Sequence, residues 1–252
     1  MIMTKAGAFP RERTDIAMQE LIEALLRSNI LWEKKWVACG DSFTEGDFSD
    51  SDEEYTFADG LYAGEKKVYP FFIGRRNHMT IVNAGKCGNT MTNLPNRPRA
   101  FSIEWYRTLP EDADYITICY GINDDDVHQK SPIGSIDDTE NTTFYGAWNV
   151  VLKYLITNHP YTKIGIIVPN GCTRPYTDAI RAVARKWGIP YLDIPGDYAV
   201  PLLNRVADKD EICAEARSIR NEQFSVSEKN RHPNARAHEY ESTVIEHWLR
   251  SL

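Results

Sequence analysis

The sequence predicts a three-layer α/β/α sandwich, in which helices cover both faces of a five-stranded, mainly parallel sheet. Short runs rich in Val, Ile and aromatic residues alternate along the chain with longer amphipathic stretches, an order typical of repeated β-α-β units. The runs are continuously apolar, which indicates parallel strands buried on both faces. A chain of 252 residues can bury a large core without the help of disulfides or metals.

Apolar periodicity predicts a helix before the first strand, over 15–31, and we expect residues 1–31 to form a helical extension to a domain of residues 32–252. The side chains on one face of that helix are Ile16, Leu21, Ile22, Leu25 and Leu26. The apolar runs predict strands at 36–39, 80–83, 115–120, 164–168 and 191–194. The stretches between and after them predict helices at 68–77, 98–108, 142–158, 175–187 and 234–250.

The charge is concentrated in one segment. The formal net charge is −7, from 29 basic and 36 acidic residues. Seven of the acids lie within 45–59, which contains no Lys or Arg, so the rest of the chain is nearly neutral. Without a basic stripe, nucleic-acid binding is disfavoured. We expect an acidic insertion at about 45–63 to be a solvated segment that overhangs the site, with Tyr55 and Phe57 as an apolar underside.

Apolar runs and cysteines indicate where such a chain resides. No stretch approaches about 18 consecutive apolar residues, so no membrane span is expected. The N-terminus has no apolar core of signal-peptide length. The five cysteines are widely spaced and form no Cys-x-x-Cys pair, which favours reduced thiols. We therefore expect a protein that is cytoplasmic or released without a Sec signal peptide.

Polar, glycine-bearing segments follow the first three predicted strands. They contain Gly40-Asp-Ser42, then Gly85-Lys-Cys-Gly88, then Gly121-Ile-Asn123. Ligands in such sheets bind beyond the carboxyl ends of the strands, so these segments should converge on one rim. A fourth polar segment, Arg231-His-Pro-Asn234, opens the last predicted helix.

These four segments, in this order, resemble the conserved blocks of the GDSL esterases, also called SGNH hydrolases, over residues 36 to about 245. The resemblance implies a flavodoxin-like SGNH fold and a serine esterase that needs no metal or organic cofactor. It also implies that Ser42 is the nucleophile and His232 the general base. The N–H groups of Ser42 and Gly88 and the side-chain amide of Asn123 would form the oxyanion hole.

Elementary chemistry supports the same roles. A serine hydroxyl needs a base to become a nucleophile, and a developing oxyanion needs fixed donors. Gly88 lacks a Cβ, so a substrate can approach its N–H closely, and Asn123 offers N–H donors without a titrating charge. Position 44 is Thr, so the segment is not the Gly-x-Ser-x-Gly elbow of α/β-hydrolases. Taken singly, these residues could be caps or turn residues.

The sequence departs from the family at the third member of the triad. The family usually has Asp three residues before its histidine, and Lys229 stands there. Glu228 could replace that acid, a backbone carbonyl could orient the imidazole in a Ser–His dyad, or the protein could be a weak or inactive relative. The acid normally fixes the tautomer and stabilises the imidazolium. We take Glu228 as the third catalytic residue.

The resemblance implies hydrolysis of a carboxylic ester, and we expect an O-acyl or O-acetyl group on a carbohydrate or another small polar molecule as the substrate. The departure at Lys229 leaves open a catalytically weak or inactive module that binds glycans or serves structurally in a larger assembly. No metal site is expected, because the consecutive acids Asp124, Asp125 and Asp126 near His128 should point in different directions. The sequence does not determine the oligomeric state.

Overall fold

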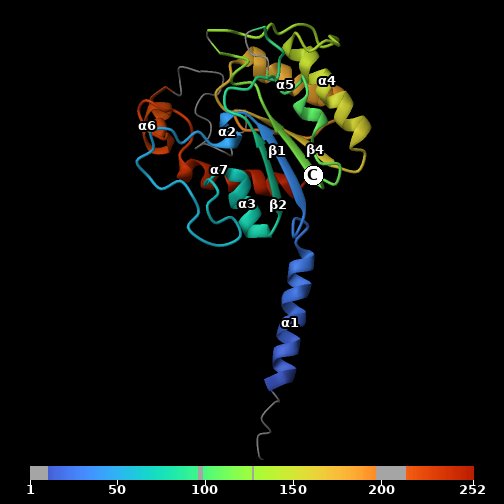
Figure 1. Ribbon diagram of the computed structural model, residues 1–252, viewed down its shortest axis with the longest axis vertical. Helices are drawn as coiled ribbons and strands as arrows, with labels where there is room; N and C mark the ends of the chain where they lie inside the picture. Colours follow the sequence, from blue (N-terminus) through green and yellow to red (C-terminus); the bar gives the residue numbers. More distant parts are fainter. Residues whose placement is uncertain (1–10, 96–98, 127, 197–213) are drawn as a thin grey trace, which may run out of the picture.

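The computed structural model describes residues 11–95, 99–126, 128–196 and 214–252, and its core is a five-stranded parallel sheet (Figure 1). The strands lie in the order β2-β1-β3-β4-β5, and every neighbouring pair is parallel. Their bounds are β1 Lys35–Gly40, β2 Thr80–Gly85, β3 Tyr115–Cys119, β4 Lys163–Val168 and β5 Tyr191–Asp193. The predicted fold class is confirmed, and the strand order is the flavodoxin-like one.

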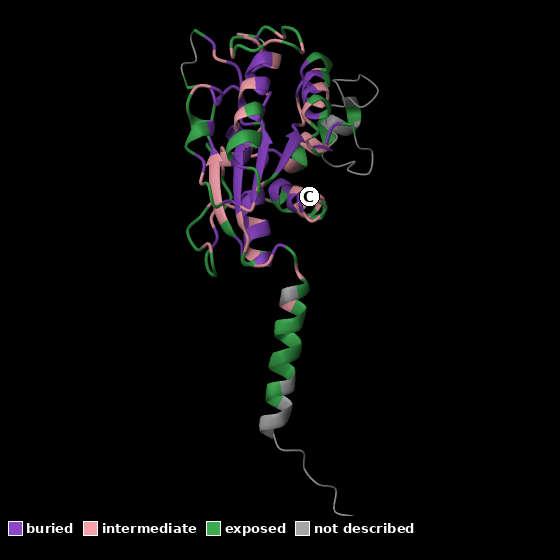
Figure 2. Ribbon diagram, turned by 90° about the vertical axis from the view of Figure 1, so that its right-hand side faces the viewer, coloured by how far each residue is buried: buried purple, intermediate pink, exposed green. Residues whose placement is uncertain are grey.

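Helices cover both faces of the sheet. On one face, α3 (Tyr69–Asn77) and α7 (Ala235–Leu249) pack on Trp36 and Ala38 of β1. On the other, α4 (Phe144–Asn158) and α5 (Arg174–Trp187) pack on Val37 and Cys39. Successive side chains of a strand point to opposite faces, so the unbroken apolar run of β1 supplies both cores. The buried residues accordingly lie along the strands and the inner sides of these helices (Figure 2).

Local signals set the ends of the helices. The Thr143 side chain caps α4 by accepting from the Gly146 N–H, and the Asn234 side chain caps α7 by accepting from the Ala237 N–H. Such caps satisfy backbone donors that the helix itself leaves unpaired. Gly188 ends α5 in the left-handed region at φ 65°, a conformation that glycine adopts without strain.

The helix predicted at 98–108 is wrong. Within this stretch the described residues form turns and a single 3-10 turn, η1 (Trp105–Arg107). The Phe101 N–H donates to the Thr90 carbonyl, and the Ser102 carbonyl accepts from the Asn141 amide. The backbone bonds to other segments rather than to itself, because these contacts carry Phe101 and Tyr106 into the core.

Within the described part of the chain, two helices are absent from the prediction. The first is a four-residue turn, α2 (Ser42–Glu45), directly after β1. The second is α6 (Ala214–Phe224), whose described side chains lie mostly in solvent. Neither segment has the apolar periodicity by which a helix is recognised in a sequence.

The N-terminal extension is helical, and α1 (Arg11–Ser28) runs away from the body of the molecule (Figure 1). Four of its predicted apolar-face side chains, Ile16, Leu21, Ile22 and Leu25, are exposed. None of the described helices is long and apolar enough to cross a membrane. Among the described residues, Cys39, Cys87, Cys119 and Cys172 form no disulfide with one another, and Cys213 lies outside the described residues.

The acidic segment after α2 is folded against the domain. Phe48 and Phe57 are buried in a small cluster with Val68 and Phe71, and Thr56 forms an antiparallel bridge with Lys66. Phe57 therefore supplies the expected apolar underside, whereas Tyr55 stacks on Phe48 and stays partly exposed. One acid of this segment, Asp47, is turned toward the polar rim.

Candidate active site

Ser42 sits where β1 gives way to a short helical turn. The side chain of Asp41 caps α2 by accepting from the Phe43 N–H at 3.0 Å. A Cβ on Gly40 would lie 2.0 Å from Thr44 Oγ1 and 3.0 Å from the Cys119 carbonyl oxygen, so only glycine fits that position. The sharp turn places Ser42 at the carboxyl edge of the sheet, with 5% of its surface exposed.

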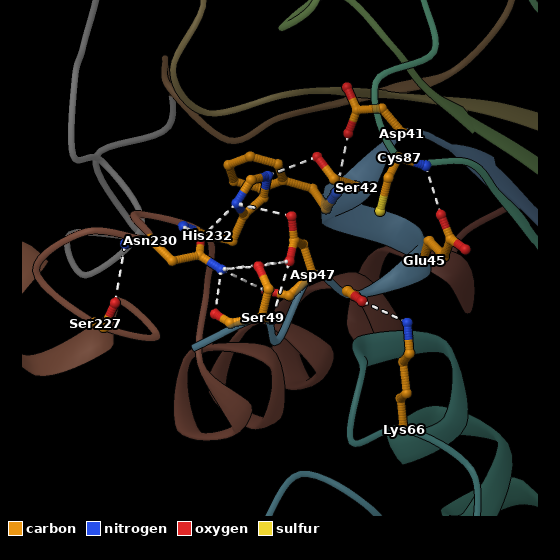
Figure 3. A network of polar contacts seen from close by, with 12 residues as sticks. Asp41, Ser42, Glu45, Asp47, Ser49, Lys66, Cys87, Ser227, Asn230 and His232 are labelled. Carbon is orange, nitrogen blue, oxygen red and sulfur yellow. Dashed lines mark hydrogen bonds and ion pairs between the residues drawn. The ribbon is translucent and has the colours of Figure 1, made fainter. Parts of the chain in front are cut away.

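His232 lies on a loop that precedes α7 and contacts Ser42 directly. An antiparallel bridge joins Ser225 to Pro233, and the Val226 N–H donates to the His232 carbonyl. The ring Nε2 is 2.7 Å from Ser42 Oγ, across 190 residues of chain (Figure 3). Phe43 stands against the ring, with the two centroids 5.5 Å apart. The distance between Nε2 and Oγ is the one that a base needs to take the hydroxyl proton.

Asn230 occupies the position on the far side of the ring. Its Oδ1 lies 2.6 Å from His232 Nδ1 and also accepts the backbone N–H of His232 at 3.1 Å. Its Nδ2 donates to the Ser49 carbonyl at 2.8 Å. The Ser49 carbonyl can only accept a hydrogen bond, and the His232 N–H can only donate one. The amide of Asn230 must therefore turn its Nδ2 toward Ser49 and its Oδ1 toward the ring. The Nδ1 atom therefore carries the proton, and Nε2 is left as an acceptor toward Ser42.

The assignment of Glu228 is corrected by this geometry. Ser227 and Asn230 close a tight turn, in which the Ser227 N–H donates to the Asn230 carbonyl and the Asn230 N–H donates to Ser227 Oγ. Glu228 and Lys229 form the tip of that turn and are exposed. Glu228 lines a surface pocket with Glu53 and Arg231, whereas the described contact to Nδ1 comes from Asn230.

Asp47 is the second polar group beside the ring. Its Oδ2 lies 3.7 Å from His232 Nδ1, and its Oδ1 accepts the hydroxyl of Ser49 at 2.6 Å and the N–H of Ser49 at 3.0 Å. Partial burial acts to raise the pKa of this carboxyl, but the two bonds from Ser49, the charge of His232 and the amide of Asn230 outweigh it and lower the pKa. Asp47 therefore stays ionised at neutral pH.

The two predicted oxyanion donors follow the strands on either side of β1. Gly88 is exposed in the segment after β2, at φ 75°, and a Cβ at this position would have no atom of another segment within 4 Å. Asn123 is half-buried after β3, and its Nδ2 donates to the Asn89 carbonyl at 2.9 Å. The edge of the sheet thus brings the segments of Ser42, Gly88 and Asn123 together at the point where the strand order reverses.

Two acids tie these segments to one another. The fully buried carboxylate of Asp124 accepts the N–H groups of Met91 and Thr92 at 2.8 and 2.9 Å, which links the segments after β3 and β2. Glu45 of α2 accepts the Cys87 N–H, which links the segments after β1 and β2. These contacts hold Asn123 and Gly88 relative to Ser42.

Protein groups already surround the acids that follow β3. Asp124 accepts from Met91 and Thr92, and Asp125 pairs with Lys130 at 2.8 Å and accepts the Thr173 N–H. Among the residues that the structure describes, no group of three His, Cys, Asp or Glu side chains is arranged to hold a metal ion.

The structure brings the predicted residues Ser42 and His232 together, and it places beside the ring Asn230 and Asp47, which sequence reasoning did not single out. Asn230 stands two residues before His232 and could have been recognised, because an amide can orient an imidazole as in Cys-His-Asn proteases. Asp47 carries no such signal, since it is 185 residues from His232 in the chain and one of seven acids in its segment.

A model of a known protein family matches the part of the chain that contains all four polar segments. The model for the GDSL-like lipase/acylhydrolase family matches residues 38–240, which include Ser42, Gly88, Asn123 and His232. The chain belongs to the GDSL-like lipase/acylhydrolase family. Membership in this family supports the assignment of the protein as a hydrolase. A search of curated proteins found no match to the chain.

Solved structures similar to this family member include proteins of several organisms. A protein from Lactobacillus plantarum is 25% identical, with a TM-score of 0.62 over 87% of this chain and 98% of that one. A candidate GDSL-like lipase from Bacteroides ovatus is 19% identical, with a TM-score of 0.59 over 87% and 99%. A carbohydrate esterase family 2 enzyme with a carbohydrate binding domain, from Corynascus thermopiles (Myceliophthora fergusii), is 12% identical, with a TM-score of 0.53 over 87% and 66%. The last two likenesses concern the fold alone.

Proposed function

We propose that the protein is a serine ester hydrolase that cleaves a carboxylic ester through an acyl-serine intermediate. The observation that carries this proposal is the 2.7 Å separation of His232 Nε2 and Ser42 Oγ, in a tautomer that leaves Nε2 as the acceptor. In such a contact the hydroxyl is the nucleophile and the neutral imidazole is the general base that takes its proton.

In the first half-reaction, Ser42 Oγ attacks the carbonyl carbon of the ester while His232 Nε2 takes the hydroxyl proton. The carbonyl oxygen becomes an oxyanion, which the N–H groups of Ser42 and Gly88 and the amide of Asn123 would stabilise. The loss of one such donor typically costs about 3–4 kcal/mol of transition-state stabilisation. Collapse of the intermediate breaks the bond to the alcohol oxygen, and His232 donates its proton to that oxygen.

In the second half-reaction, water replaces the alcohol. His232 Nε2 takes a proton from the water as its oxygen attacks the acyl carbon, and the same donors receive the second oxyanion. The bond to Ser42 Oγ then breaks, the proton returns to Oγ, and the carboxylic acid leaves. The reaction written in this way draws on no metal or organic cofactor.

We propose an O-acyl or O-acetyl group on a carbohydrate or another small polar molecule as the substrate. The described side chains beside the His232 ring are mostly polar, namely Ser42, Asn230 and Asp47, together with the apolar Phe43. The ionised carboxylate of Asp47 beside His232 disfavours an anionic substrate. The fold is shared with a carbohydrate esterase family 2 enzyme, so it is compatible with a polyhydroxylated alcohol.

Two measurements test the proposal: hydrolysis of p-nitrophenyl acetate and covalent labelling by a fluorophosphonate probe. The protein should do both, and Ser42→Ala should abolish both. Ser251→Ala is the matched control, because Ser251 is an exposed serine beyond the opposite end of α7. Full activity in a clean preparation of Ser42→Ala would refute the nucleophile. A protein that neither hydrolyses nor labels would be the binding or structural module that the sequence left open.

A further inference from the structure

Among the residues that the structure describes, Asn230 and Asp47 both lie near the proton-bearing nitrogen of His232. Asn230 Oδ1 lies at hydrogen-bonding distance, 2.6 Å, and Asp47 Oδ2 lies at 3.7 Å, which is within reach of an ion pair but too long for a hydrogen bond. In the usual triad a single aspartate makes the hydrogen bond and carries the charge. Here the contact and the charge belong to residues 183 positions apart.

Asn230 can hold the ring but cannot neutralise it. Its amide is fixed by the Ser49 carbonyl on one side and the His232 N–H on the other, and the whole residue is nearly buried. A neutral carbonyl oxygen selects the Nδ1–H tautomer and the ring orientation. It provides much less stabilisation than a carboxylate for the positive charge that the imidazole gains in the transition state.

Asp47 is placed to provide that charge. Ser49 holds its carboxylate through two hydrogen bonds, and the Ser49 carbonyl and hydroxyl also receive the Asn230 amide at 2.8 and 3.1 Å. Asp47 and Asn230 are therefore held by the same residue (Figure 3). The lowered pKa of Asp47 has the charge of His232 among its causes, and by reciprocity the carboxylate favours the protonated ring.

We propose that this active site divides the work of the triad acid between two positioning residues: Asn230 fixes the tautomer and orientation of His232, and Asp47 stabilises the imidazolium by its charge. This inference rests on the proposed function, because it assigns the charge that a Ser42–His232 pair needs during turnover. It also gives a role to an acid of the segment that the sequence presented as a solvated insertion.

The other charged groups around the ring do not duplicate Asp47. On α2, Asp41 is engaged by the Phe43 N–H and Glu45 by the Cys87 N–H. Arg231 precedes His232 in the chain with an exposed side chain. Among the described acids, Asp47 is the one within ion-pair distance of His232.

The substitution Asp47→Asn tests the charge, because its Oδ1 can still accept from Ser49. In an NMR titration the pKa of His232 should fall by about 0.5–1 pH unit. The acidic limb of kcat/KM on p-nitrophenyl acetate should move to lower pH by the same amount, while the plateau falls about threefold to tenfold. Asp52→Asn is the same change at an exposed acid of the same segment. It should leave the acidic limb and the plateau of kcat/KM, and the pKa of His232, unchanged.

The substitution Asn230→Ala tests the orientation. It should remove the preference for the Nδ1–H tautomer, which the 15N shifts of the ring report, and should lower kcat about tenfold or more. Unlike Asp47→Asn, it retains the negative charge beside the ring. The acidic limb in Asn230→Ala should therefore move less than in Asp47→Asn.

The outcomes separate this inference from the proposed function. An unmoved titration of His232 in Asp47→Asn would overturn the role of the charge, and an unchanged tautomer in Asn230→Ala would overturn the role of the amide. Both NMR results stand whether or not the protein hydrolyses a test ester. Absent labelling of wild-type Ser42 would instead refute the esterase itself.

Discussion

Asp41, which directly precedes the nucleophile, is the most perturbed carboxyl of the site. Burial raises its pKa to about 7, and the nearby charge of Asp124 adds to this, while the Phe43 N–H opposes it. One carboxylate oxygen, Oδ2, is buried without a hydrogen-bond partner among the described residues. The folded protein therefore favours the protonated form of Asp41 over a range in which an unfolded Asp is ionised.

This leads to a prediction about stability and pH. The stabilisation due to protonation of Asp41 is fully present below about pH 4 and is lost as the pH rises to about 7. The Asn side chain of Asp41→Asn cannot ionise. As the pH rises from about 4 to about 7, the unfolding free energy of the variant minus that of wild type should therefore increase by up to about 4 kcal/mol. Urea unfolding at several pH values measures this difference. For Asp52→Asn, at an exposed acid, the difference in unfolding free energy from wild type should not change with pH. A difference that is likewise independent of pH in Asp41→Asn would contradict the prediction.

Residues of the site differ in how far a sequence can reveal them. Ser42 and His232 stand in short motifs whose order along the chain points to their meeting in space. Asn230 was missed because an acid was expected as the partner of the ring, although Asn230 is only two residues from His232 along the chain. Asp47 follows from tertiary structure alone, since it depends on how the segment after α2 folds back on the loop before α7.

At the scale of elements, the close packing of β2 against α2 sets the position of the nucleophile. A Cβ on Gly85 would lie 2.4 Å from the Glu45 backbone nitrogen and 2.9 Å from the Thr44 carbonyl carbon. The Asn83 amide also donates to the Thr44 carbonyl, and the Lys86 N–H donates to the Gly40 carbonyl. The end of β2 thus fixes the turn that carries Ser42.

Gly85→Ala should therefore reduce both stability and catalysis. Overpacking of this kind typically costs about 1–3 kcal/mol, and a displacement of α2 should lower kcat about tenfold to a hundredfold. Gly165→Ala is the control. Its Cβ would lie 2.5 Å from the Trp248 ring, so it is also overpacked, but Gly165 belongs to β4, which carries no predicted catalytic residue. It should lose stability but keep kcat per molecule labelled by a fluorophosphonate. Equal kcat in both variants would show that α2 is not held by β2.

Elements with strong apolar patterns were predicted well, and those without them were not. The five strands and the helices α3, α4, α5 and α7 have runs or periodicities that bury one or both faces. The stretch at 98–108 has apolar residues at helical spacing, but its backbone groups bond to Thr90 and Asn141. Such long-range bonds override local propensity, and a local pattern cannot reveal them.

For the whole molecule, the strand order explains why distant segments share one site. The order β2-β1-β3-β4-β5 reverses direction at β1, and the segments after β2, β1 and β3 leave the same edge side by side. In an open α/β sheet this is where ligands bind. The loop before α7 completes the site from the other end of the chain, because α7 packs against α3 on the face beneath β1 and β2.

The boundary between the N-terminal extension and this domain is the last prediction. The sequence suggested a division after residue 31, but Leu31 is fully buried, and the Asn29 side chain donates to Asn77 and accepts from Arg250. A variant that lacks residues 1–28 should keep its esterase activity and melt within about 2 °C of the full chain, because α1 extends into solvent. A variant that lacks residues 1–31 loses the buried Leu31, a loss of about 2–5 kcal/mol, and should melt about 5–15 °C lower. Thermal melts of both variants at matched concentration measure the difference, and equal melting temperatures would place the boundary at residue 31.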